Sequence, residues 1–287
     1  METSTNSGRR WNEGGDTLLF IGFLSLIAWI PIPLGSNRAW AWSLMEVWAY
    51  GLVGIWLIMQ AVRPKRLPSA LRSARWSLLF LGLWLAYTLL QALPLPAALV
   101  SAMNPAAYEL YRYALGLDMG ESISLSVDRR ATLGQFLLAG SYGAIYLLTL
   151  LLVTSRARLT LTMTVVMFVG LAEAVYGLFN TLSGTEMIGW MKKEAYLGDV
   201  TGTYVNRNHF AGLMEIAIPV AIGLLIAEKN IHHYHPTWGR RLAGVGTALL
   251  EARGRLALYI VIMFAALFLS GSRGGSASLI VSVTALL

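Results

Sequence analysis

Residues 210–227 read FAGLMEIAIPVAIGLLIA, an apolar run that contains one charged residue, Glu215. A helix rises about 1.5 Å per residue, so a run of this length nearly crosses the hydrocarbon core of a bilayer, which is about 30 Å thick. The run is continuous, whereas a strand of a membrane barrel alternates apolar and polar residues. This stretch therefore predicts a transmembrane helix, and the fold class that it favours is all-α.

Six similar runs occur elsewhere in the chain. They cover Thr17 to Leu34, Ala41 to Val62, Trp76 to Leu93, Thr132 to Val153, Leu159 to Leu182 and Leu256 to Ser270. An eighth run opens near Ser276 and reaches Leu287 after about a dozen residues, where a spanning helix needs roughly 20. We expect residues 1–287 to form a single integral membrane domain, a polytopic bundle with seven full spans and a truncated eighth. We also expect this to be the N-terminal fragment of a longer protein.

The composition agrees with a membrane protein and limits its chemistry. Of the 287 residues, 56% are hydrophobic and 13% are charged, whereas soluble domains carry about 25% charged residues. The absence of cysteine excludes disulfides, thiolate nucleophiles and thiolate metal sites. The first apolar run follows Arg9 and Arg10 as in a signal peptide, but it is long and lacks a small-residue cleavage site. We interpret it as an uncleaved anchor.

The positive charge is explained by membrane topology. The net charge is +7, and the connection from Arg63 to Arg75 carries five basic residues and no acidic one. Short connections rich in Lys and Arg stay on the cytoplasmic side. We therefore expect a multi-pass protein with a cytoplasmic N-terminus, with membrane lipids as partners and no nucleic acid. On this topology the loops from Pro94 to Ala131 and from Ser183 to His209 face outward.

Two loop segments have more than one interpretation. Ala98 to Leu117 carries Tyr108, Tyr111 and Arg112 at helical spacing, which predicts a helix on the outer membrane surface or an ordinary packed loop helix. The inner loop from Glu228 to Arg255 contains three clustered histidines. They are His232, His233 and His235. Their spacing can bind a metal ion, but no carboxylate or cysteine cluster accompanies them, so a solvated loop is favoured and no metal is expected.

The second outer loop ends in GTYVNRNHFAG, residues 202–212, directly at the start of the apolar run quoted above. Asn206 or Asn208 suits a helix N-cap, where unpaired N–H groups and the positive end of the helix dipole attract anions. Arg207 adds a guanidinium that can pair with two phosphate oxygens. The alternative is that the asparagines only cap the helix while Arg207 reaches lipid headgroups. The motif by itself does not decide between them.

The second motif is LSGSRGGS, residues 269–276, a glycine-rich break between two apolar runs. Successive N–H groups in glycine turns can form an anion-binding nest beside Arg273. A tight turn whose arginine meets lipid headgroups is the alternative. By the count of helices both motifs lie on the same outer side, so together they favour an anion site that contains Arg207 and Arg273.

Three acidic residues, Glu46, Glu173 and Glu215, fall within predicted spans. An ionised side chain there costs a few kcal/mol and usually faces a partner or a wet cavity. Glu215 lies about two turns below Arg207 and could orient it, while Glu46 and Glu173 could pair with tyrosines or with each other. An alternative function, a transporter or flippase of a lipid-linked or anionic substrate, also uses such groups, although the chain shows no internal repeat. A membrane scaffold without catalysis leaves the two arginine motifs unexplained.

The two motifs together resemble the O-antigen ligase/polymerase superfamily, in which a G-T-x-x-N-x-N-x-x-A-G helix start precedes an S-R-G-G turn. The resemblance covers residues 202–287, the start of the O-antigen ligase-related region, and the earlier helices only by hydropathy. It implies a bacterial inner-membrane glycosyltransferase with a periplasmic active face, acting in polysaccharide or lipopolysaccharide biosynthesis. Such an enzyme transfers or polymerises glycan from an undecaprenyl diphosphate-linked donor to a glycan or lipid A-core acceptor, without a cofactor.

The resemblance also implies roles for individual residues. Arg207 and Arg273 would bind the diphosphate and stabilise its charge as it leaves, with Glu215 as a third catalytic candidate. The expected substrate-binding residues are Asn206, Asn208, His209, Ser272 and Gly274. The family's large outer loop, whose histidine assists the acceptor, is expected beyond residue 287, and the resemblance does not assign the role of that histidine to His209. Ligase and polymerase therefore both stay open.

Overall fold

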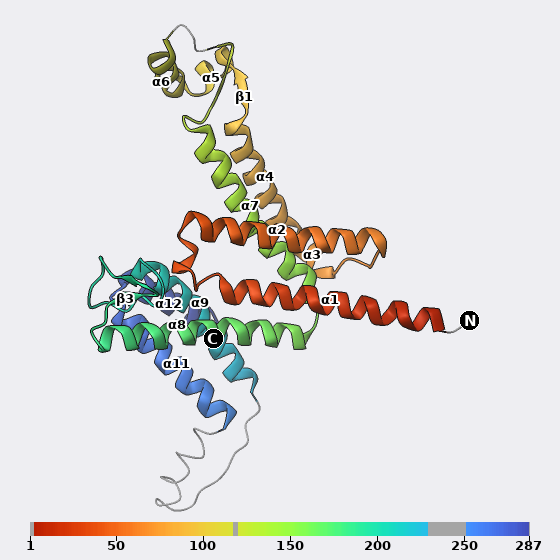
Figure 1. Ribbon diagram of the computed structural model, residues 1–287, viewed down its shortest axis with the longest axis vertical. Helices are drawn as coiled ribbons and strands as arrows, with labels where there is room; N and C mark the ends of the chain where they lie inside the picture. Colours follow the sequence, from red (N-terminus) through yellow and green to blue (C-terminus); the bar gives the residue numbers. More distant parts are fainter. Residues whose placement is uncertain (1–2, 117–119, 229–250, 287) are drawn as a thin grey trace, which may run out of the picture. The chain divides into compact units, whose positions relative to one another are not determined.

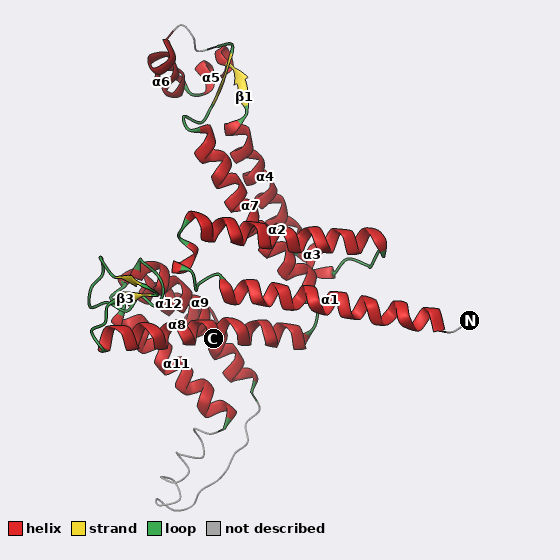
Figure 2. Cartoon of the chain, in the orientation of Figure 1, coloured by secondary structure: helices red, strands yellow, loops and turns green. Residues whose placement is uncertain are grey.

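The computed structural model describes residues 3–116, 120–228 and 251–286 (Figure 1). Helices make up 76% of the structure, and Figure 2 shows how little strand accompanies them. The all-α prediction is therefore confirmed at the level of class. The histidines at positions 232, 233 and 235 lie outside the described residues.

Each predicted apolar run coincides with a long helix. These helices are α1 (Thr3–Trp29), α2 (Ala39–Val62), α4 (Arg75–Ala92), α7 (Arg129–Leu152), α8 (Arg156–Leu182), α9 (Arg207–Ala227), α11 (Ala252–Leu269) and α12 (Arg273–Leu286). Five of them, α2, α7, α8, α9 and α11, are long and apolar enough to cross a membrane. The length and apolar composition of these five helices indicate a membrane protein. The count of seven full spans stays a prediction.

The first helix is shorter at its C-terminal end than its apolar run. The sequence predicted a span from Thr17 to Leu34, but α1 ends at Trp29 and its apolar part is Gly14–Trp29. Proline lacks an N–H and clashes with the preceding turn, so Pro31 and Pro33 end the helix. A short 3-10 helix, η1 (Leu34–Ser36), follows.

The chain divides into two compact units. One consists of Met1–Ala41 with Ser155–Leu287, and the other of Trp42–Thr154. The sequence predicted one membrane domain over residues 1–287, because no linker or change of composition separates these segments. Both candidate motifs belong to the first unit.

The second unit is built on the packing of α4 along α7, visible in Figure 1. The loop between α4 and α7 holds α5 (Ala97–Met103) and α6 (Pro105–Leu115), and β1 (Pro94–Pro96) pairs antiparallel with β2 (Ser122–Ser124). The short α3 (Ser69–Ser73) precedes α4. The sequence predicted one helix over Ala98 to Leu117, but Asn104 interrupts it. Its side chain accepts a hydrogen bond from Ala107 N at 3.1 Å and caps α6.

The core of the first unit lies where α8, α9, α11 and α12 pack together. Buried side chains from all four helices form it, and they include Met167, Phe210, Met214, Ile218, Met263 and Leu279. Small residues let the helices approach closely. Gly170 of α8 faces Ala217 of α9, and Gly275 of α12 faces Ala211 of α9. The loop between α8 and α9 contains the short hairpin of β3 (Met187–Ile188) and β4 (Met191–Lys192).

Candidate functional site

The structure brings the two sequence motifs together at the starts of α9 and α12. Asn208, in the first turn of α9, accepts a hydrogen bond from Ser272 Oγ at 2.9 Å. Ser272 directly precedes Arg273, the first residue of α12. Two helix N-termini, each with an arginine at its first position, therefore lie next to each other.

Both helix starts are capped by side chains from the motifs. Asn206 Oδ1 accepts from Asn208 N at 2.8 Å, which confirms the predicted N-cap of α9. Ser272 Oγ accepts from Gly275 N at 3.2 Å and caps α12 in the same way. Gly271, in the turn between α11 and α12, has a φ of +64°, and a Cβ there would lie 3.2 Å from Arg207 Nη1. Only glycine fits this turn without strain.

The guanidinium of Arg207 is held from two sides. Its Nη1 forms an ion pair with Asp199 Oδ2 at 2.6 Å, and its Cζ lies 5.2 Å from the centre of the Tyr196 ring. Its Nε is buried and makes no hydrogen bond within the described part of the chain. The sequence suggested Glu215 as the residue that orients Arg207, whereas Asp199 is the carboxylate that contacts it here.

A buried lysine fixes the segment that carries Asp199. Lys193 Nζ donates to the backbone oxygen of Asp199 at 2.5 Å and lies 3.3 Å from Glu186 Oε2. Only 3% of the Lys193 side chain is exposed. Gly198 N donates to Glu186 Oε1 at 2.7 Å, and this bond, with a smaller contribution from Lys193, lowers the pKa of the Glu186 carboxyl. Sequence reasoning missed this arrangement, because Lys193 resembles an ordinary loop residue.

Glu173 connects the middle of α8 to the loop that leads into α9. Its carboxylate is buried and accepts from Thr203 N at 2.7 Å, and Thr203 Oγ1 lies 2.8 Å from its Oε1. The same hydroxyl lies 2.9 Å from the backbone oxygen of Pro31. Burial and the nearby Glu173 raise the pKa of the Tyr204 hydroxyl. The hydrogen-bond partner of Glu173 is therefore Thr203, whereas the sequence suggested a tyrosine or Glu46.

The other two acidic candidates lie apart from Arg207. Glu215, half-buried on α9, faces α12, since its Oε1 would lie 3.2 Å from a Cβ on Gly275. It sits below the two helix starts, on the contact between these helices. Glu46 belongs to the other compact unit, where it lies within electrostatic reach of Tyr50 and Tyr142.

The remaining predicted site residues are open to the surroundings. Arg273 and His209 are exposed, and Gly274 has free space where a Cβ would lie. None of the ion pairs between described residues involves Arg273. No group of three or more His, Asp or Glu that could hold a metal ion occurs in the described ranges. The site thus offers one paired and one exposed guanidinium beside two helix N-termini.

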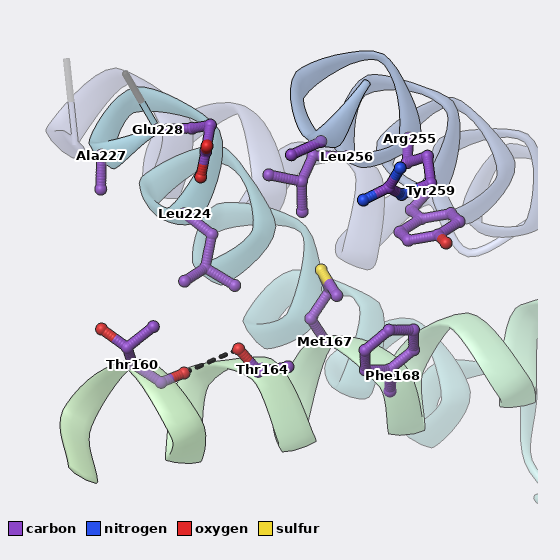
Figure 3. Close-up of a pocket in the computed structure, with 11 residues that line it drawn as sticks. Thr160, Thr164, Met167, Phe168, Leu224, Ala227, Glu228, Arg255, Leu256 and Tyr259 are labelled. Carbon is purple, nitrogen blue, oxygen red and sulfur yellow. Dashed lines mark hydrogen bonds between the residues drawn. The ribbon is translucent and has the colours of Figure 1, made fainter. Parts of the chain in front are cut away.

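A cavity of about 360 Å³ lies elsewhere, at the other end of α9 (Figure 3). It is lined by side chains from α8, α9 and α11, such as Thr164, Leu224 and Tyr259. None of the site residues that the sequence predicted lines it. The candidate site at Arg207 is therefore an exposed polar surface and not this cavity.

Fold and site together define a helical membrane protein with a cationic surface at the starts of two packed helices. Comparisons with known protein families, with curated proteins and with solved structures give no match to this chain. The motifs at residues 202–212 and 269–276 are therefore the basis for a functional proposal.

Proposed function

We propose that this chain belongs to a membrane glycosyltransferase that moves glycan from an undecaprenyl diphosphate carrier to a sugar hydroxyl. The acceptor is a growing glycan or a lipid A-core. The observation that carries the proposal is the hydrogen bond between Ser272 and Asn208. This bond joins the starts of α9 and α12, so that Arg207 and Arg273 belong to one surface.

This surface has the chemistry that a diphosphate requires. Each helix start presents N–H groups and the positive end of its dipole, equivalent to about half an elementary charge. A guanidinium adds donors that match pairs of phosphate oxygens. Among the hydrogen bonds of the described residues, Arg207 uses Nη1 for Asp199, so its other terminal nitrogen, Nη2, keeps donors for a ligand.

Charge stabilisation is the catalytic contribution of these groups. In the transfer, the bond between the anomeric carbon and the diphosphate oxygen breaks, and the diphosphate keeps the electron pair. A bond forms between the anomeric carbon and the acceptor oxygen, whose proton passes to water. Removal of one donor to such a developing charge costs about 10²- to 10³-fold in rate. Arg207 and Arg273 are the groups proposed to stabilise it, and Glu215 lies nearby on α9.

The proposed location is the bacterial inner membrane, with a cytoplasmic N-terminus and the Arg207 surface on the periplasmic side. Support comes from the basic connection between Arg63 and Arg75, which favours the cytoplasm. The Arg207 surface lies on the opposite side by the count of helices. Membrane lipids are the expected surroundings, and the chemistry described above requires no cofactor.

The experiment uses bacterial cells that lack the full-length gene. We expect them to accumulate undecaprenyl diphosphate-linked glycan, which wild-type protein relieves and the variants Arg207→Ala and Arg273→Ala do not. Arg112→Ala is the matched control. It removes an arginine from the other predicted outer loop, where Arg112 pairs with Glu109 on the surface of α6. Relief by both site variants, at normal protein levels, would refute the proposal.

The side of the membrane on which the donor accumulates separates the proposal from the transporter or flippase alternative. A transporter predicts no accumulation of finished donor on the outer side and a flux driven by an ion gradient. Such a flux would depend on a buried carboxylate, and Glu173→Gln would abolish it. Accumulation with no effect of Glu173→Gln on any flux favours glycan transfer.

A further inference from the structure

The cavity at the far end of α9 has a polar rim. Glu228 directly follows α9, and Arg255 lies in the first turn of α11. In Figure 3 the Glu228 carboxylate and the Arg255 guanidinium are both directed to the space between the helices, across from Thr160 and Thr164 of α8. The rim therefore contains one acidic side chain, one basic side chain and two threonine side chains.

The deeper part of the cavity is apolar. Met167 and Phe168 follow Thr160 by seven and eight residues on α8, which places them about 10 to 12 Å further along the helix axis. Leu224 and Leu256 close the apolar part from α9 and α11. Since all three helices are long and apolar enough to span a membrane, the cavity changes from polar to apolar in the direction from membrane surface to membrane interior.

We propose that this cavity binds one phospholipid whose head group carries both a phosphate and a primary ammonium, as in phosphatidylethanolamine. Arg255 binds the phosphate, and Glu228 accepts hydrogen bonds from the ammonium. Part of an acyl chain lies along Met167 and Phe168, and the remainder stays in the bilayer. The cavity volume of about 360 Å³ lies within the range of small-molecule sites, about 300 to 1,000 Å³.

The opposite charges at the rim select this head group over others. An anionic head group such as phosphatidylglycerol satisfies Arg255 but leaves the Glu228 carboxylate beside a second negative charge. The quaternary ammonium of phosphatidylcholine has no N–H to donate to a carboxylate. This lipid site is separate from the Arg207 surface and does not depend on the proposed glycan transfer.

The test measures lipid binding to the full chain purified in detergent and freed of lipid. Phosphatidylethanolamine, phosphatidylglycerol and phosphatidylcholine with identical acyl chains are titrated separately, and bound lipids are counted by native mass spectrometry. Wild type should bind one phosphatidylethanolamine at the lowest concentration. Arg255→Ala should weaken this binding about 10-fold or more, the loss of one charged hydrogen bond. Glu228→Gln should remove the preference for phosphatidylethanolamine over phosphatidylglycerol.

Two further variants make the result specific. Arg156→Ala removes an exposed arginine from the start of α8 that does not line the cavity, and it should bind lipid as wild type does. Thr164→Trp fills the cavity without a change of charge and should abolish the one-to-one binding while circular dichroism shows an unchanged helix content. Equal binding of the three lipids to wild type, equal effects of Arg255→Ala and Arg156→Ala, or undiminished binding to folded Thr164→Trp would each overturn the proposal.

Discussion

Replacement of Asp199 by Asn tests whether this carboxylate competes with an anionic ligand for Arg207. The change removes the charge and keeps the size of the side chain that lies 2.6 Å from Arg207 Nη1. The side chains of Arg207 and Asp199 are 35% and 25% exposed, so we expect the pair to contribute about 1 kcal/mol, the upper part of the range for surface pairs. In wild type, an anionic ligand that takes the place of the carboxylate must first break this ion pair. In Asp199→Asn the pair is absent, so the affinity of the ligand should rise about fivefold.

The assay is isothermal titration calorimetry with inorganic pyrophosphate, on the full chain purified in detergent. Asp199→Asn should bind pyrophosphate about fivefold more tightly than wild type, and Arg207→Ala in the same background should cancel this gain. Asp16→Asn is the matched control, since Asp16 forms an ion pair of the same 2.6 Å length with Arg158 but lies outside the candidate site. An affinity of Asp199→Asn that equals or falls below that of wild type would refute the reasoning.

Three further predictions concern stability. The pKa of the Glu186 carboxyl is lowered in the folded state, so its contribution to stability is present above its unfolded pKa and is lost as the pH falls through its folded pKa. Glu186→Gln should therefore reduce the dependence of the melting temperature on pH between about pH 5 and pH 3. A pH dependence equal to that of wild type contradicts this. Gly275→Ala should lower the melting temperature because a Cβ there meets Ala211, whereas Gly274→Ala, with open space, should not. Glu173→Ala leaves the Thr203 N–H without its acceptor and should cost about 1 to 3 kcal/mol in a chemical unfolding experiment; a smaller loss than that of Thr203→Ser would argue against it.

The helices of this protein follow from its sequence because continuous apolar runs admit few other structures in a membrane. The residues around Asn206 were predictable for a related reason, since an asparagine before an apolar run is a local signal for a helix start. The count of helices placed both arginine motifs on one side, and the bond between Ser272 and Asn208 agrees with this. These features depend on residues that are close in the sequence, or on whether an odd or even number of membrane helices precedes a loop.

The partner of Arg207 was not predictable in this way. Several acidic residues lie in the same loop, and Asp199 is selected by the path of the backbone, which the buried Lys193 and its contact to Glu186 stabilise. A lysine with 3% exposure is rare, and composition gives no sign of it. The division into two compact units likewise depends on contacts between segments that are distant in the sequence.

The segments that the contact between α9 and α12 joins are made at different times during synthesis. Asp199 precedes Arg207 by eight residues, so the ribosome delivers the acidic partner of this arginine first. Ser272, which bonds to Asn208, is made 64 residues later, after α11 has been completed. The two arginines therefore belong to one surface only after the turn that follows α11 has formed.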